Sequence, residues 1–349
     1  MTKHSHADRT SFGPLRIMHL VSGGGPTSIP IEIAKACRAE SIEIDVLVAP
    51  PRASIAYVSS IVSLLTNSPD ILHVHHATSA LLPALLARLR GIRVVKTEHR
   101  DPRSLSRVAA LANWIVARVS HAVVFNSAAT EQAWLAGTPR VFRSRLTLII
   151  RNGVDLTEIP VTHVGGHETI RIFTAARIIA EKRHSLIAAA LADLGSTEWH
   201  VVGDGPLLRA LQEQVTELGI EKRVRFHGAL ERSDMFAILS SADISVYVSS
   251  TEGFCNAAAE SLLAGVPLIV SSVPALTELA GDDAAATIQS DDPSELAAAI
   301  EAVIQNLDSI RIRAKTAASQ RRVDLSMERC ASQYVGLYRV LMGTCHSYS

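Results

Sequence analysis

The sequence predicts an α/β protein of two doubly wound, Rossmann-like domains that face each other across a cleft. Short apolar runs rich in β-branched residues alternate with longer stretches of helical period, the pattern of βαβ units. Apolar residues make up 48% of the chain but aromatic residues only 4%, which favours the aliphatic cores of helix-covered parallel sheets. The 349 residues also exceed the length of one ordinary domain.

The first half contains six runs with the composition of buried parallel strands, separated by stretches with apolar residues at helical spacing. We expect strands over 16–21, 44–48, 71–75, 93–97, 122–125 and 147–150. We expect helices over 30–40, 80–90, 104–119 and 128–136.

This pattern pauses at 160–168, a polar stretch with one proline and two glycines. A second series follows, with strands expected over 170–175, 198–202, 224–227, 244–248, 267–271 and 286–288. The predicted organisation is an N-terminal domain over 1–160, a linker over 161–168, a C-terminal domain over 169–325, and a C-terminal helix over 326–349 that crosses back to the N-terminal domain. Ligands of such sheets bind at the carboxyl ends of the strands, so the site is expected in the cleft.

Composition limits the compartment and the partners. The four cysteines form no C-x-x-C pair, which argues against a zinc site and a disulfide framework and fits a reducing compartment. The first fifteen residues lack the apolar core of a signal peptide, and no stretch reaches the roughly 20 apolar residues of a spanning helix. We therefore expect a cytoplasmic protein. Residues 1–160 hold 18 Lys or Arg against 11 Asp or Glu, so the basic half is the better candidate for anionic surfaces.

The most informative segment runs from 242 to 279. It reads as a buried strand, a loop with Glu252, Gly253 and Phe254, and a helix from about Asn256. Backbone N–H groups of the first helical turn would point into the crevice, where they can bind phosphate or hydroxyl oxygens. Glu252 and Glu260 lie eight residues apart, so the two carboxylates can address different parts of one extended ligand.

This segment resembles the retaining GT-B glycosyltransferases, specifically family four, whose E-x7-E motif is met by Glu252 and Glu260. The resemblance continues in Arg177 and Lys182, which match the basic pair that grips the donor diphosphate, and in Thr97-Glu98-His99, whose histidine lies beside the transferred sugar in related enzymes. It implies that His99, Arg177, Lys182 and Glu252 are catalytic. The donor-binding residues that it implies are Gly23, Gly24, Gly203, Gly205, Gly253, Phe254, Cys255, Asn256 and Glu260.

The resemblance implies a transferase that moves a sugar from a nucleoside diphosphate sugar to a glycan or lipid-linked acceptor with retention of configuration, in bacterial surface polysaccharide, lipopolysaccharide or glycolipid synthesis. No Asp-x-Asp motif stands in a suitable loop, so neither a metal nor another cofactor is expected. Nucleic acid is not an expected partner.

Other functions fit the same architecture. A phosphorylase or a nucleotide-sugar epimerase would share the two domains, and a non-catalytic module would bind the sugar nucleotide without turnover. A dehydrogenase fits poorly, because no G-x-G-x-x-G follows the first strand.

A basic segment from 88 to 118 suggests peripheral contact with an anionic membrane, because cations near such a surface each contribute about 1 kcal/mol. The apolar residues of the helix over 104–119 are expected to face the core, with only the cations exposed. The basic residues of the segment are Arg88, Arg90, Arg93, Lys96, Arg100, Arg103, Arg107 and Arg118.

Overall fold

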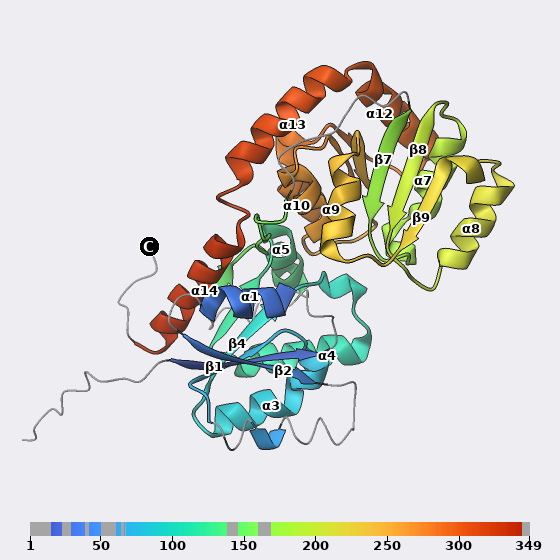
Figure 1. Ribbon diagram of the computed structural model, residues 1–349. Helices are drawn as coiled ribbons and strands as arrows, with labels where there is room; N and C mark the ends of the chain where they lie inside the picture. Colours follow the sequence, from blue (N-terminus) through green and yellow to red (C-terminus); the bar gives the residue numbers. More distant parts are fainter. Residues whose placement is uncertain are drawn as a thin grey trace, which may run out of the picture.

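The computed structural model describes residues 15–22, 29–38, 42–49, 61–63, 66, 68–137, 146–159 and 169–343. Two six-stranded sheets, parallel at every pairing, form its two halves, which confirms the predicted fold class (Figure 1). The strand orders are β2-β1-β3-β4-β5-β6 and β12-β11-β10-β7-β8-β9. The expected linker at 161–168 lies outside the described residues.

The central strands of the first half are buried because helices cover both faces of the sheet, while the edge strands β2 and β6 are partly exposed. The strands are β1 (Arg16–Ser22), β2 (Glu43–Ala49), β3 (Ile71–Val74), β4 (Arg93–Glu98), β5 (Ala122–Phe125) and β6 (Leu146–Ile149). The helices are α1 (Ile29–Arg38), α3 (Ala77–Leu89), α4 (Arg107–Val119) and α5 (Ala128–Gly137).

The second half repeats the arrangement around a core of mainly aliphatic side chains. Its strands are β7 (Ile170–Ala175), β8 (Thr197–Val202), β9 (Val224–Gly228), β10 (Ile244–Tyr247), β11 (Leu268–Ser271) and β12 (Ala286–Ile288). Its helices are α7 (His184–Ala192), α8 (Leu208–Glu217), α9 (Arg232–Ser240), α10 (Asn256–Leu263), α11 (Pro274–Ala280), α12 (Pro293–Gln305) and α13 (Leu307–Arg321).

The helix expected over 104–119 begins later, at Arg107, so its predicted start was wrong. Ser106 is the N-cap, and its hydroxyl accepts a hydrogen bond from the Ala109 N–H at 3.3 Å. The residues before it form a separate 3₁₀ turn, η1 (Pro102–Ser104), whose first turn is capped by the Asp101 carboxylate. Two capping side chains five residues apart therefore divide the segment into a turn and a helix.

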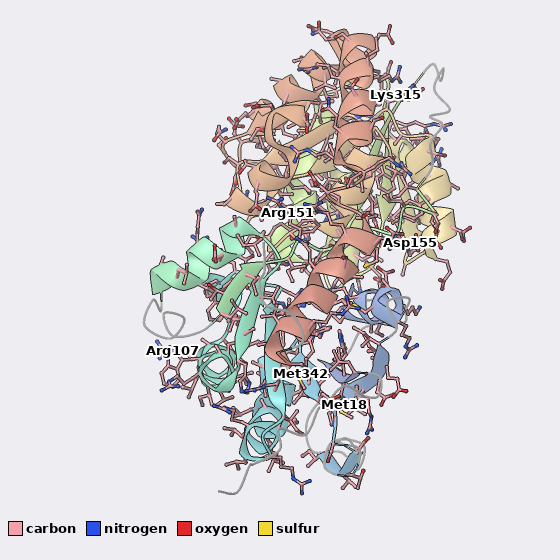
Figure 2. All side chains as sticks on the ribbon, turned by 90° about the vertical axis from the view of Figure 1, so that its left-hand side faces the viewer. Met18, Arg107, Arg151, Asp155, Lys315 and Met342 are labelled. Atoms are coloured by element: carbon pink, nitrogen blue, oxygen red, sulfur yellow. The ribbon has the colours of Figure 1, made fainter. Side chains whose placement is uncertain are left out.

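The last helix, α14 (Met327–Leu341), packs beside α1 on the first half, while α13 belongs to the second (Figure 1). Residues 325–327 run next to Val154 as a short parallel bridge, with Val154 N–H bonded to Leu325 O at 2.8 Å. A Cβ on Gly153 would lie 2.5 Å from Met327 Cα, so only glycine lets the two segments approach so closely. Figure 2 shows Arg151 and Asp155 at this junction, between Lys315 in one half and Met342 in the other.

Candidate active site

The loop after β10 carries Glu252 and contacts the first half of the molecule. The Gly253 carbonyl accepts hydrogen bonds from Ser127 Oγ at 2.6 Å and Thr130 Oγ1 at 3.1 Å. A Cβ on Gly253 would lie 2.0 Å from the carbonyl oxygen of His99. Because the glycine permits this approach, the Glu252 loop and the end of β4 meet at one edge of the cleft.

Lys182 and Glu252, both predicted site residues, lie together. The Lys182 ammonium pairs with the Glu252 carboxylate, and Ser249 Oγ donates a hydrogen bond to the same carboxylate at 2.7 Å. Lys182 closes the 3₁₀ turn η2 (Ala180–Lys182) after β7. Arg177 stands at the start of the same connection, with its side chain exposed. Arg177 and Lys182 therefore both follow β7, and Lys182 is held against a carboxylate of the neighbouring strand end.

Gly203 and Gly205 form the turn after β8, which packs against the Arg177 connection. A Cβ on Gly203 would lie 2.1 Å from the Ala176 carbonyl oxygen, and one on Gly205 would lie 2.3 Å from that of Ile178. Gly203 also has φ +131°, which disfavours residues with a side chain. The two glycines are thus required by backbone packing that positions the basic connection.

Helix α10 begins directly after the Glu252 loop. The Phe254 side chain is buried in the core, so only its backbone is available to a ligand. Cys255 is the N-cap with φ +69°, and burial raises the pKa of its thiol far above the usual range, so the thiol stays neutral. The Asn256 side chain accepts a hydrogen bond at 3.0 Å from Asn152, which ties the helix start to the junction.

Glu260 lies on α10 with 6% of its surface exposed and faces Arg232, the first residue of α9. Arg232 Nη1 is 3.0 Å from the Glu260 carboxylate and 3.5 Å from that of Glu32 on α1, and Nε is 2.9 Å from Glu158. Burial raises the pKa of Glu260 to about 7, and the Arg232 charge opposes that rise. Sequence reasoning missed Arg232, because its acidic partners come from three separate segments.

His99 follows β4 and lines a cavity of about 290 Å³ together with His75, His76, Glu98 and Arg100. Its Nε2 is hydrogen-bonded to His75 Nδ1 at 3.0 Å. Burial lowers the pKa of His99 to about 3, so its ring is neutral at physiological pH. The histidine can therefore exchange hydrogen bonds with a hydroxyl-bearing ligand but does not carry a charge to it.

A second, larger cavity of about 610 Å³ lies between the two halves. Glu252 and Glu181 border it from the second half, and Asp101, Arg103 and Thr130 border it from the first. Space for an extended ligand is thus present on the side of the Glu252 loop that faces η1 and α5.

A buried polar cluster beneath His99 was not expected from the sequence. His19, His73 and His75 come from β1 and the end of β3, and their ligand-capable nitrogens lie within 4.8 Å of one another, close enough to hold a metal ion. The hydroxyl of Tyr338, which lies far along the sequence in α14, is hydrogen-bonded to both His19 and His73. The sequence shows two of these histidines at a strand end, but nothing in it brings Tyr338 near them.

Lys96 was expected among the surface cations, and that expectation was wrong. Its side chain is buried, pairs with Glu98, and donates a hydrogen bond to Asn113 Oδ1 at 2.6 Å. The other seven cations of the 88–118 segment are exposed. The apolar stripe of α4 also differs from expectation, because Val108 and Leu111 are 64% and 60% exposed.

Two expected donor-binding residues, Gly23 and Gly24, lie outside the described residues. Among the described residues, no helix combines the length and apolar character needed to cross a membrane.

Comparison with known proteins places both halves in one group. The profile described as "Glycosyl transferases group 1" matches residues 158–321, and the profile described as "Glycosyltransferase Family 4" matches residues 18–158. Glycogen synthase of Mycobacterium tuberculosis is 25% identical over 77% of this chain and 68% of its own. The alpha-monoglucosyldiacylglycerol synthase of Streptococcus pneumoniae is 30% identical over 39% of this chain and 32% of its own.

Solved structures show the same fold. Anabaena Alr3699/HepE, in complex with UDP and glucose, has a TM-score of 0.77 at 17% identity and covers 93% of this chain and 100% of its own. Sucrose-phosphate synthase of Thermosynechococcus elongatus has a TM-score of 0.83 at 17% identity, over 95% of this chain and 100% of its own. Since the two profiles together span both sheets and the architecture agrees, the chain belongs to the group 1 glycosyltransferases of GT-B fold.

Proposed function

We propose that the protein transfers a sugar, with retention of configuration, from a nucleoside diphosphate sugar to a glycan or lipid-linked acceptor of a bacterial surface polysaccharide or glycolipid. The observation that carries the proposal is the Glu252 loop, which pairs with Lys182 and packs against the backbone of His99. Charged groups that can bind a diphosphate therefore lie next to neutral groups that can bind a sugar, at one edge of the cleft. The UDP and glucose of the Alr3699/HepE complex agree with this choice of donor.

In this proposal the second half holds the donor. Arg177 and Lys182 neutralise the charge that grows on the diphosphate as the glycosidic bond breaks, the kind of electrostatic stabilisation that dominates many enzymes. The guanidinium makes a forked contact with phosphate, and the ammonium acts as a point charge. Glu260 binds the ribose hydroxyls and Glu252 those of the sugar.

The acceptor enters over the first half and attacks from the face that the nucleotide leaves. The departing phosphate takes the acceptor proton, so the chain need not supply a base. The positive charge comes from Arg177 and Lys182 in place of a metal ion. The transfer activity is therefore expected to be unchanged by a chelator.

The test is a thermal-shift screen against UDP-, GDP- and ADP-sugars, followed by turnover assays with the donor that binds. The matching donor raises the unfolding temperature because it binds only the folded protein. Retained configuration of the product, read by NMR, and unchanged activity in EDTA support the proposal. Inverted configuration refutes it, as does manganese-dependent activity.

The alternatives separate in the same assays. A phosphorylase requires inorganic phosphate, and an epimerase returns an altered sugar nucleotide without an acceptor. A non-catalytic module raises the unfolding temperature with a sugar nucleotide but turns over none of a broad panel of acceptors.

We also propose that the first half docks on the cytoplasmic face of an anionic membrane, where a lipid-linked acceptor is presented. The neighbouring helices α3 and α4 each expose an apolar stripe. The stripe of α3 consists of Leu82, Leu85 and Leu89, and that of α4 consists of Val108, Leu111 and Trp114. Exposed arginines adjoin these stripes, and Figure 2 shows Arg107 at the surface of the first half. Apolar side chains flanked by cations suit the boundary between headgroups and acyl chains of anionic lipid.

Vesicle sedimentation tests this docking. Vesicles with anionic lipid should bind the protein at low salt and release part of it at high salt, while neutral vesicles bind less. Leu111→Glu should reduce binding and leave donor turnover on a soluble acceptor unchanged, and Leu218→Glu, on the second half, is the matched control. Equal binding to neutral and anionic vesicles would contradict the proposal.

A further inference from the structure

A continuous chain of hydrogen bonds runs from the cleft edge to the C-terminal helix. It starts at His99 Nε2, which bonds His75 Nδ1 at 3.0 Å, and His75 Nε2 bonds His19 Nδ1 at 3.2 Å. His19 Nε2 then bonds the Tyr338 hydroxyl at 3.0 Å, and the same hydroxyl bonds His73 Nδ1 at 2.7 Å.

The chain continues to a second tyrosine of α14. His73 Nε2 lies 2.7 Å from Thr97 Oγ1, and that hydroxyl lies 3.0 Å from the Tyr334 hydroxyl. Tyr334 and Tyr338 are both fully buried. One end of the chain therefore lines the cavity beside the donor site, and the other lies in the core under α14.

The two nitrogens of each ring are used in the same order along the whole chain of hydrogen bonds. A neutral imidazole carries one N–H and one acceptor nitrogen, and burial keeps the pKa of all four histidines well below the usual value, so the four rings are neutral. Each ring uses Nε2 toward Tyr334 and Nδ1 toward His99. If every link is made, His99, His75 and His19 share one tautomer, and His73 shares it when Tyr338 accepts from one imidazole and donates to the other.

Tyr338 is the coupling point of this chain. Its hydroxyl has one hydrogen, so it can accept from one imidazole while it donates to the other. In the all-Nε2–H arrangement His19 donates to Tyr338, and Tyr338 donates to His73. An isolated imidazole favours the Nε2–H form, and four coupled rings add up that preference. His99 then presents Nδ1 as an acceptor, and this nitrogen makes no hydrogen bond with any described residue.

We propose that Tyr338 is a positioning residue that fixes, through His19 and His75, the tautomer in which His99 accepts a hydrogen bond from a hydroxyl of the transferred sugar. The proposal rests on the function proposed above for the part that concerns the sugar. A helix from the end of the chain thus sets the hydrogen-bonding role of a residue at the cleft, in the way that the partner of one ring nitrogen determines the role of the other.

Ring-¹⁵N-labelled histidine provides the test in the free, full-length protein, with His99→Gln used only to assign the His99 signals. The ¹⁵N shifts should report the neutral Nε2–H tautomer for His19, His73, His75 and His99 alike. Tyr338→Phe leaves the buried His19 Nε2–H without its acceptor, and the cost of this unpaired donor opposes the Nε2–H preference, so the His99 shifts should move toward a mixture of tautomers. Tyr334→Phe is the matched control, because it removes an equally buried hydroxyl from the same helix beyond the last ring, and it should leave His99 unchanged.

Kinetics give the second readout. Tyr338→Phe should lower kcat/KM for the sugar donor by about two- to tenfold, the range for one neutral hydrogen bond. Inhibition by the free nucleoside diphosphate should stay the same, because the proposed arrangement places the sugar, and not the nucleotide, beside His99. Tyr334→Phe should change neither value.

Three outcomes overturn the proposal: mixed tautomers among the four rings of the parent protein, His99 shifts that ignore Tyr338→Phe, or equal effects of the two variants. Stoichiometric zinc in the purified protein, with histidine shifts that change on its removal, would also overturn it in favour of a metal site at His19, His73 and His75. Tautomer shifts as expected in a parent protein that transfers no sugar would refute the proposed function and leave the Tyr338 assignment intact.

Discussion

Replacing Glu260 by glutamine tests the buried pair of Glu260 and Arg232, because the expected change of folding stability with pH has a definite sign. Burial raises the pKa of Glu260 from 4.5 to about 7 in the folded protein. Between these two values the folded protein binds more protons than the unfolded chain, so this carboxyl makes the folded state less stable as the pH rises. The pKa values differ by about 2.5, which at about 1.4 kcal/mol per pH unit amounts to about 3 kcal/mol.

Urea unfolding of the parent protein and of Glu260→Gln between pH 5 and pH 8 measures this difference. We expect the free energy of unfolding of the variant, relative to the parent, to rise by about 2 to 3 kcal/mol across that range. Glu213→Gln is the control, because Glu213 is an exposed helix residue that pairs with Arg209 on the same helix. A relative stability of Glu260→Gln that stays flat with pH would refute the reasoning, as would the same trend in the control.

Three further predictions concern the cleft. Arg177→Ala should lower donor turnover by about a hundredfold, the scale of losing one transition-state contact, and EDTA should have no effect on the parent enzyme. Glu252→Gln should weaken use of the intact sugar donor by roughly 1.5 to 3 kcal/mol, measured as kcat/KM, and should spare inhibition by free nucleotide; equal losses in both would contradict its assignment to the sugar. Gly253→Ala should lower the free energy of unfolding by about 1 to 3 kcal/mol and reduce activity, because its Cβ would lie 2.0 Å from the His99 carbonyl oxygen. Gly195→Ala, where the new Cβ meets no atom within 4 Å, is the control and should be close to neutral.

The strands were predictable because parallel strands are short apolar runs whose limits are local. All twelve lie within one residue of the expected ranges at each end. Helix limits were less predictable, as α4 shows. Its apolar period continues back to Leu105, but the start depends on whether Ser106 or an earlier residue caps the first turn, and both positions carry suitable side chains.

The burial of single charged residues was decided by tertiary contacts. Lys96 lies on a strand covered on both faces, where Glu98 from the same strand and Asn113 from α4 partner its ammonium. A charge in sequence suggests exposure, because an unpaired buried charge is costly, and only the packing of α4 on β4 supplies the partners that offset this cost. Conversely, an apolar residue in sequence suggests burial, but Val108 and Leu111 of α4 are exposed.

The sequence alone determined the two-sheet architecture and the segments that carry Arg177, Lys182, Glu252 and Glu260, because strand period and motif spacing are local properties. Only the tertiary structure brought Arg232 to Glu260 and Tyr338 to His19, residues that lie 28 and 319 positions apart. A hydrogen bond depends on distance and direction in space, and the return of α14 to the first sheet brings this late helix against β1.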